Sequence, residues 1–234
     1  MIVGLTRSAT GSTTVIPYRF ARITPPATEP LTLQQAKAQC RVVTDDENEA
    51  ISDLIRAARS LCESEPSLDS GGTGRACLTQ TWDLILHRFP NWGRGEAWSV
   101  GDGVLVSGGV APVRIPKPPL QSVTSVTYVD PDGVVQVWNP SLYTVETPSG
   151  DEAEPGSIAP VNGEGYPPTR TQPGAVTIRF VAGYGSTAAA VPAALTHGMK
   201  LLIGHWWVNR PAVGERADVL PFGVDALWQS FRVL

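Results

Sequence analysis

The sequence predicts an α+β fold in which a small helical bundle carries an inserted β-rich domain. Three stretches with helical periodicity are interrupted by a block, residues 78–186, where apolar residues recur with period two. Each helical stretch has an apolar stripe too wide to leave in water, so we expect the three helices to pack together. The expected divisions are an extended arm at 1–30, a helical core from 31–77 and 187–234, and the β-rich insertion at 78–186.

Composition indicates an ordinary globular protein with many turns. The chain has 234 residues with 42% hydrophobic content, and its 23 Gly and 21 Pro favour irregular connections over long solvated helices. The net charge of −4 provides no global basic field for nucleic acid or anionic lipid. No apolar run is long enough to span a bilayer. The three cysteines have no C-x-x-C spacing, which favours free thiols and synthesis in a reducing cytoplasm.

The first 30 residues show no helical period. Residues 15–23 predict one extended segment, and the prolines Pro25, Pro26 and Pro30 enforce extended backbone after it. We therefore expect an arm that lies over the domain or over a neighbouring subunit.

Two helices are expected before the β block. The first begins at Thr32, which together with Gln35 has the form of a capping box. The second is the clearest periodic signal in the chain, because its apolar residues fall on one face of an α-helix. Those residues are Ile51, Leu54, Ile55, Ala58, Leu61 and Cys62. The glycine-rich run at 71–74 ends this helix and links it to the β block.

Strand and turn signals follow one another through the β block. Trp82, Leu84 and Leu86 share one face of a predicted strand. Residues 126–138 predict a hairpin whose turn is Asp130-Pro131-Asp132-Gly133, because Pro presets φ and Gly accepts the left-handed position. Another strand is expected at 175–181. Gly-rich residues 90–112 predict an exposed excursion, and the acidic, Pro-rich stretch 147–174 predicts a loop.

A third helix is expected from Val191-Pro192 onward. It is apolar on nearly all sides, which is typical of a helix at the centre of a bundle. A short C-terminal helix follows, with an apolar stripe formed by Val224, Leu227, Trp228 and Phe231. Because little chain is left for that stripe to fold against, we expect a neighbouring subunit to cover it.

No catalytic, cofactor or metal site is predicted. His197 and His205 lie about two helical turns apart, too far for an i, i+4 zinc site. The motif Asp130-x-Asp132-Gly133 lacks the remaining ligands of a calcium loop. The glycine-rich run at 71–74 follows a helix and precedes a strand, the reverse of a P-loop. The tryptophans are not interleaved with basic residues, so a single-stranded nucleic-acid platform is not indicated.

A series of short segments, taken in order, resembles the head–tail connector (adaptor) proteins of tailed phages and gene transfer agents. The matching segments are Pro25–Lys37, Asp45–Arg59, Thr73–Ala76, Leu78–Trp82, Ile115–Val123, Val181–Gly185, Val191-Pro192, His205-Trp206, Asn209-Arg210 and Leu220–Val224. The resemblance extends from about residue 24 to residue 232. Residues 1–20 and 92–109 go beyond the family's pattern.

The resemblance implies a structural protein, not an enzyme, in the neck of a virion or virus-like particle made in the bacterial cytoplasm. Such a connector forms a dodecameric ring below the portal, joins capsid to tail and lines the DNA channel. The implied partners are further copies of the chain, the portal protein and a tail-side neck or stopper protein. DNA would pass through the channel without sequence-specific binding, and no membrane or cofactor is involved.

We assign the contacts with the portal or a neighbouring subunit to the C-terminal segment, because aromatic anchors are typical of interfaces. The assigned residues are Leu220, Phe222, Val224, Leu227, Trp228, Phe231 and Arg232.

Two alternatives stay open from the sequence. A carbohydrate- or surface-binding module of a virion would expose several tryptophan rings on one concave face, whereas a connector would bury them or direct them at subunits. The rings in question are Trp82, Trp92, Trp98 and Trp138. A hydrolase would need a deep pocket with convergent polar groups.

Overall fold

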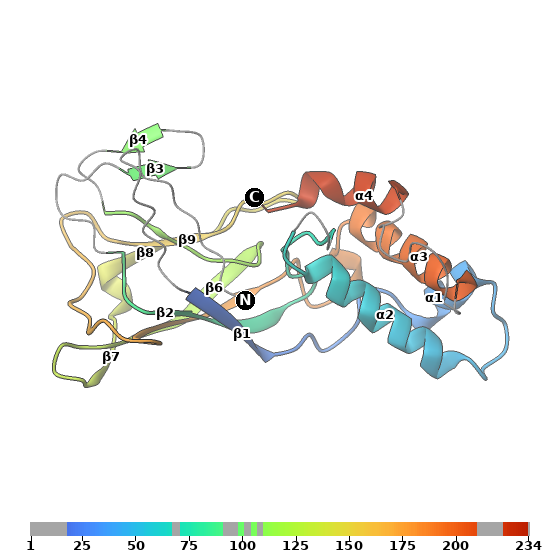
Figure 1. The fold of residues 1–234 in the computed structure, drawn as a ribbon, viewed down its shortest axis with the longest axis horizontal. Helices are drawn as coiled ribbons and strands as arrows, with labels where there is room; N and C mark the ends of the chain where they lie inside the picture. The colour runs from blue at the N-terminus through green and yellow to red at the C-terminus, as the bar shows by residue number, and fades with distance from the viewer. Residues whose placement is uncertain are drawn as a thin grey trace.

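Helices and sheets occupy opposite ends of an elongated molecule (Figure 1). The computed structural model describes residues 18–66, 71–90, 110–209 and 222–233, together with the backbone of two short strands at 98–100 and 104–106. The helical end has its own hydrophobic cluster and the sheet end has another. The predicted α+β class is therefore confirmed.

Within the described residues, the helical end is built from four α-helices. Their bounds are α1 Leu33–Cys40, α2 Asn48–Glu63, α3 Ala193–Val208 and α4 Phe222–Trp228, with the single 3₁₀ turn η3 Gln229–Phe231 after α4. The predicted capping box begins α1: the backbone N–H of Gln35 donates to Thr32 Oγ1, and the N–H of Thr32 donates to Gln35 Oε1. Both interactions satisfy backbone donors that an isolated helix end leaves unpaired.

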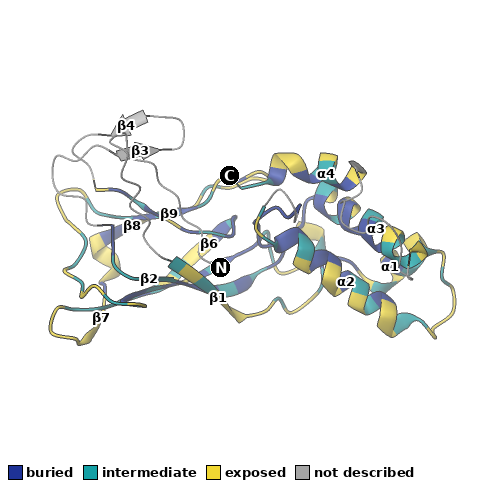
Figure 2. Ribbon diagram, viewed as in Figure 1, coloured by how far each residue is buried: buried dark blue, intermediate teal, exposed yellow. Residues whose placement is uncertain are grey.

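The predicted second helix is confirmed as α2. Its inward face buries Ile51, Ile55, Ala58 and Cys62, whereas the outward face is exposed (Figure 2). Between Ile51 and Cys62, the exposed residues are Asp53, Arg56, Ala57 and Ser60. The buried stripe packs against α3, which also contacts α1 and α4 and so lies at the centre of the bundle, as predicted. At the C-terminal end of α3, Val208 is 78% exposed among the described residues.

The larger sheet has five antiparallel strands in the order β1-β2-β10-β6-β7. Their bounds are β1 Tyr18–Thr24, β2 Gln80–Leu86, β10 Val176–Ala182, β6 Leu120–Val129 and β7 Val135–Val137. The register places Ile178 of β10 between Leu84 of β2 and Val126 of β6, and all three side chains are buried. The alternation seen in the sequence therefore gives one buried face, as a period of two requires.

Two smaller sheets complete the β end. The first has β5 Val113–Arg114, β9 Ser157–Pro160 and β8 Tyr143–Glu146, and the second pairs β3 Trp98–Val100 with β4 Val104–Val106. Short 3₁₀ turns lie at η1 Pro140–Leu142 and η2 Ala188–Ala190. Between the larger sheet and the first of these lies an aromatic cluster, in which Phe89 stacks on Tyr166 and meets Trp138 edge-on.

Local turn chemistry positions the β6–β7 hairpin as predicted. Asp130 accepts hydrogen bonds through its side chain from the N–H of Val134 and from Gln136. These bonds hold the pKa of the Asp130 carboxyl below its ordinary value. Gly133 takes a φ of 90°, the left-handed region that glycine enters at little cost.

A segment expected to be extended and another expected to be a loop both form strands. Residues 18–24 of the predicted arm are the edge strand β1, because Tyr18 and Phe20 turn toward the sheet core and pair with β2. Within the predicted loop 147–174, β9 forms because the fully buried Ile158 is covered by β5 and β8. Residues 1–17 and most of the excursion at 90–112 lie outside the described residues.

The C-terminal stripe is covered by the chain itself. Val224, Trp228 and Phe231 are buried in the helical cluster, so the expectation that a neighbouring subunit covers them is wrong. Trp228 reaches the backbone of α3 because Gly198 has no side chain, and its Nε1–H donates to the carbonyl of Leu195 over 3.4 Å. Sequence periodicity could not reveal this contact, since it depends on how α4 lies across α3.

We expect Gly198→Ala to destabilise the chain, because the new Cβ would lie 2.2 Å from Trp228 Nε1. Overpacking of this kind costs about 1–3 kcal/mol and outweighs the roughly 1 kcal/mol that alanine adds to a helix. Gly204→Ala in the same helix is the matched control, since its Cβ meets only the exposed Gln39 side chain at 3.2 Å. Denaturant unfolding should show a loss for the first and no loss for the second; equal shifts would contradict the packing.

Candidate assembly interface

Apart from its core side chains, the C-terminal segment, residues 222–233, has both half-buried and exposed residues at its surface. Leu227 is half-buried, and Arg232 pairs with Asp225 at 2.5 Å. The exposed positions on the segment are Gly223, Ala226, Gln229 and Ser230. Leu220 and the side chain of Phe222 lie outside the described residues. The structure therefore places three of the predicted contact residues in the core and leaves Leu227 and Arg232 within reach of solvent.

The end of this segment is fixed where the helices meet the sheets. The N–H of Val233 donates to the carbonyl of Thr73 over 3.0 Å. Arg75, which is buried, donates to the carbonyl of Phe231 over 2.5 Å and to that of Ala153 over 2.7 Å. One guanidinium thus connects the C-terminal segment to a loop of the β end.

A buried carboxylate organises the same junction. Glu63, the last residue of α2, accepts through Oε1 from the N–H of Cys77 at 3.1 Å and from Gln80 Nε2 at 2.7 Å. Its Oε2 lies 3.1 Å from a guanidinium nitrogen of Arg59 and 3.5 Å from one of Arg22. Charge-assisted bonds of this kind are stronger than neutral ones, so a single side chain links α2 to β1 and β2.

Arg59 extends the network to the proline-rich segment before α1. Its Nε and second guanidinium nitrogen donate to the two carboxylate oxygens of Glu29 at 2.6 and 3.1 Å, a bidentate arrangement. Burial lowers the pKa of Arg59, but the hydrogen bond to Glu29 and the charges of Glu63 and Glu29 outweigh it, so the pKa lies above its ordinary value. The guanidinium stays charged.

Lys117 closes the junction from the β side. Its ammonium is 4% exposed and donates to the carbonyl of Glu63 over 2.7 Å, while pairing with Glu65 at 2.6 Å. It also lies 5.0 Å from the centre of the Phe20 ring, within cation–π range. A buried ammonium is costly unless it is paired and hydrogen-bonded, and this one is both.

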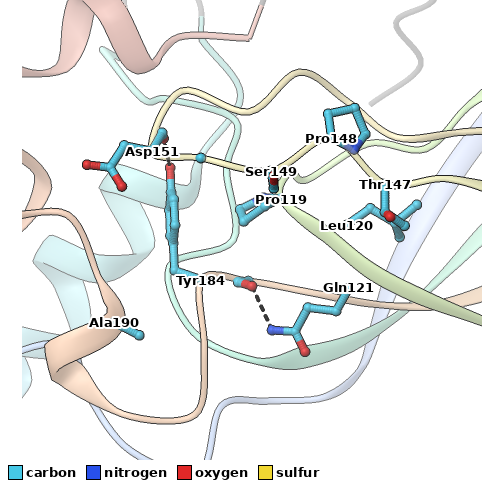
Figure 3. Close-up of a pocket in the computed structure, with 11 residues that line it drawn as sticks. Pro119, Leu120, Gln121, Thr147, Pro148, Ser149, Asp151, Tyr184 and Ala190 are labelled. Carbon is cyan, nitrogen blue, oxygen red and sulfur yellow. Dashed lines mark hydrogen bonds between the residues drawn. The ribbon is translucent and has the colours of Figure 1, made fainter.

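A groove borders this junction (Figure 3). It has a volume of about 410 Å³, and its wall includes Tyr184, Gln121 and the loop 147–151. Tyr184 donates its hydroxyl to the carbonyl of Asp151, and Gln121 donates to the carbonyl of Gly183. Burial raises the pKa of Tyr184 far above its ordinary value. These polar groups bind the chain's own backbone, so they do not form the convergent set that a hydrolase would need.

The tryptophan rings do not favour a carbohydrate-binding face. Trp82 and Trp138 are 8% and 4% exposed and belong to the hydrophobic cluster of the β end. The side chains of Trp92 and Trp98 lie outside the described residues. The alternative therefore lacks half of the exposed rings on which it depends.

The described parts of the chain contain no group of three or more His, Cys, Asp or Glu residues arranged to hold a metal ion. None of the helices in those same ranges has the length and apolar character needed to cross a membrane.

Comparison with solved structures gives the fold a counterpart. A chain in the neck of an empty gene transfer agent particle, computed with C6 symmetry, superposes with a TM-score of 0.66 at 22% identity, covering 92% of this chain and 96% of that one. The chain has the fold of a neck protein. A chain of the native gene transfer agent virion gives a TM-score of 0.63 at 22% identity, with coverage of 92% and 95%. A chain of the native neck computed with C12 symmetry gives 0.56 at 24% identity, with coverage of 91% and 96%.

The comparisons with sequences give no such counterpart. No protein-family model matches the chain, and a search of curated proteins finds no match.

Sequence reasoning missed the junction residues, although a signal for them was present. Glu29, Arg59, Arg75, Gln80 and Lys117 each fall within one of the segments that carry the connector resemblance. Several of them are charged residues with glycine or proline close by in the sequence. A charged side chain that contacts only solvent does not require such neighbours. Their shared position, where the helices meet the sheets, becomes visible only when the segments are brought together.

We expect Glu63→Gln to lower the free energy of unfolding by roughly 3 kcal/mol, because Arg59 and Arg22 would then face an amide instead of a carboxylate. Asp53→Asn is the matched control on the same helix, since Asp53 pairs with Arg56 at an exposed position and such pairs contribute little. Urea titrations of both variants would measure the difference. A Glu63→Gln variant as stable as the control would show that the junction does not depend on this charge.

Proposed function

We propose that the chain is a structural connector in the neck of a tailed phage or gene transfer agent particle, joining the DNA-filled head to the tail. The observation that carries this proposal is the fold shared with chains of the gene transfer agent neck and virion over more than nine-tenths of both chains. The independent resemblance of ordered sequence segments to head–tail connectors supports it. The role needs no catalysis.

The proposed assembly is a ring of identical subunits, twelve in the particle, below the portal. The C6 and C12 symmetries of the neck structures that share the fold support a ring. Such a ring would line the DNA channel. A net charge of −4 suits that position, because many phosphate contacts from Lys and Arg would hold DNA and slow its passage.

We propose that the C-terminal segment meets the portal or a neighbouring subunit, with a tail-side neck or stopper protein at another face of the ring. Within the segment, Val224, Trp228 and Phe231 hold the helix on α3. Leu227 and Arg232, together with Leu220 and Phe222, would then supply the contacts. The buried side chains fix the position of the segment, and the remaining side chains would then contact the partner.

Deletion of the gene in the organism that produces the particles tests the function as a whole. We expect heads that do not retain DNA and tails that are not attached, visible by negative-stain electron microscopy and restored by the gene on a plasmid. A tag on the chain should label the head–tail junction. Tailed, DNA-containing particles in the deletion strain would refute the connector role.

Leu227→Asp tests the C-terminal contact more sharply than truncation, because truncation would also remove three core side chains. We expect the variant to fold but to lower the yield of tailed particles by at least about tenfold, since a buried unpaired charge at an interface costs several kcal/mol. Leu142→Asp, at an exposed leucine of the β end, is the control. Equal particle yields from the two variants, with unchanged melting temperatures, would place the contact elsewhere.

A further inference from the structure

The junction between α2 and the larger sheet contains two thiols in direct contact. The Sγ atoms of Cys62 and Cys77 lie 3.7 Å apart, and both side chains are fully buried. Cys62 is in the last turn of α2, whereas Cys77 lies just before β2. Neither thiol contributes to the proposed contacts with partners, so the pair is without a role in that account.

The backbone around the two thiols is held independently of them. Next to Cys62, Glu63 accepts from the N–H of Cys77 at 3.1 Å. On the other side, Thr73 donates its N–H and its hydroxyl to the carbonyl of Cys62 over 2.9 and 2.7 Å. These bonds keep the two segments adjacent whether or not the sulfurs are joined. A disulfide has an S–S length of about 2.05 Å, so bond formation needs a sulfur movement of roughly 2 Å.

We propose that Cys62 and Cys77 form an oxidation site that converts to an intramolecular disulfide when the chain meets a small peroxide. One thiolate attacks a peroxide oxygen, which gives a sulfenic acid and releases hydroxide. The second thiol then attacks the sulfenic sulfur and expels water. In total, two thiols and one hydrogen peroxide give one disulfide and two water molecules, so the thiols lose two electrons and the peroxide gains them.

The properties of the two thiols favour slow, lasting disulfide formation and not the rapid oxidation of a sensor cysteine. The hydrogen bond that Cys77 donates to Cys62, together with burial, raises the pKa of the Cys77 thiol well above its ordinary value. Little of that thiol is therefore ionised near neutral pH, and reactive sensor cysteines have the opposite character. Because both thiols are buried, a small oxidant reaches them more readily than a bulky one. The cross-link would fasten α2 to the start of β2 across the junction.

The consequence is a chain that gains stability on leaving a reducing cell. A disulfide restricts the unfolded chain, and for a loop of this size the expected gain corresponds to a rise in melting temperature of roughly 5–10 °C. The chemistry belongs to the chain itself and does not depend on the connector role. If the chain does serve in an exported particle, the same step would stabilise it after release.

The test uses the purified full-length chain carrying Cys40→Ala, so that only the two junction thiols are present. After treatment with hydrogen peroxide, denaturation and alkylation, we expect intact-mass spectrometry to show a monomer that takes up no alkyl group. Dithiothreitol should restore uptake of two alkyl groups and reverse the rise in melting temperature. Peptide mapping of the wild-type chain should find Cys62 joined to Cys77.

Cys62→Ser and Cys77→Ser are the matched controls, each compared with itself before and after peroxide. We expect neither to gain stability. If a serine variant does not fold, the peptide map of the wild-type chain still decides the question. Full alkylation after peroxide, oxidation of each thiol to a sulfinic acid, or disulfides formed only between molecules would each overturn the proposal.

Discussion

The arrangement of this molecule depends on the hydrogen bonds and ion pairs of the Glu63 carboxylate. Glu63 ends α2 inside the protein and accepts hydrogen bonds from the segment that enters the larger sheet, while its second oxygen faces arginines of α2 and β1. A buried charge without partners would be very costly, so each partner has a favoured position relative to this one group. These contacts thereby fix the position of the helical end relative to the sheet end.

Further buried cations extend that constraint outward from Glu63. Arg59 connects it to the proline-rich segment before α1, and Lys117 donates to the backbone carbonyl of Glu63 from the β side. Arg75 holds the C-terminal segment at the same junction through the carbonyl of Phe231.

The same arrangement suits the connector role that we propose. Its polar side chains with well-defined geometry are used to hold segments together, and those of the groove beside Tyr184 bind the chain's own backbone. A subunit that joins large bodies needs surfaces whose relative positions stay fixed. The proposed connector role asks for that property, and the thiol pair beside Glu63 would strengthen it at the same point.

The sequence by itself determined the features whose causes lie within a few residues. The capping box at Thr32, the apolar stripe of α2 and the turn at Asp130–Gly133 were predicted correctly because their interactions are local. The order of short matching segments along the sequence also indicated the resemblance to connectors. What only the tertiary structure decided depends on residues far apart in the chain: β1 as an edge strand, Ile158 in a strand, and Trp228 covered by α3. Periodicity shows that a face must be buried, but the partner that buries it is selected by packing across the whole fold, as the close approach of Trp228 to Gly198 illustrates.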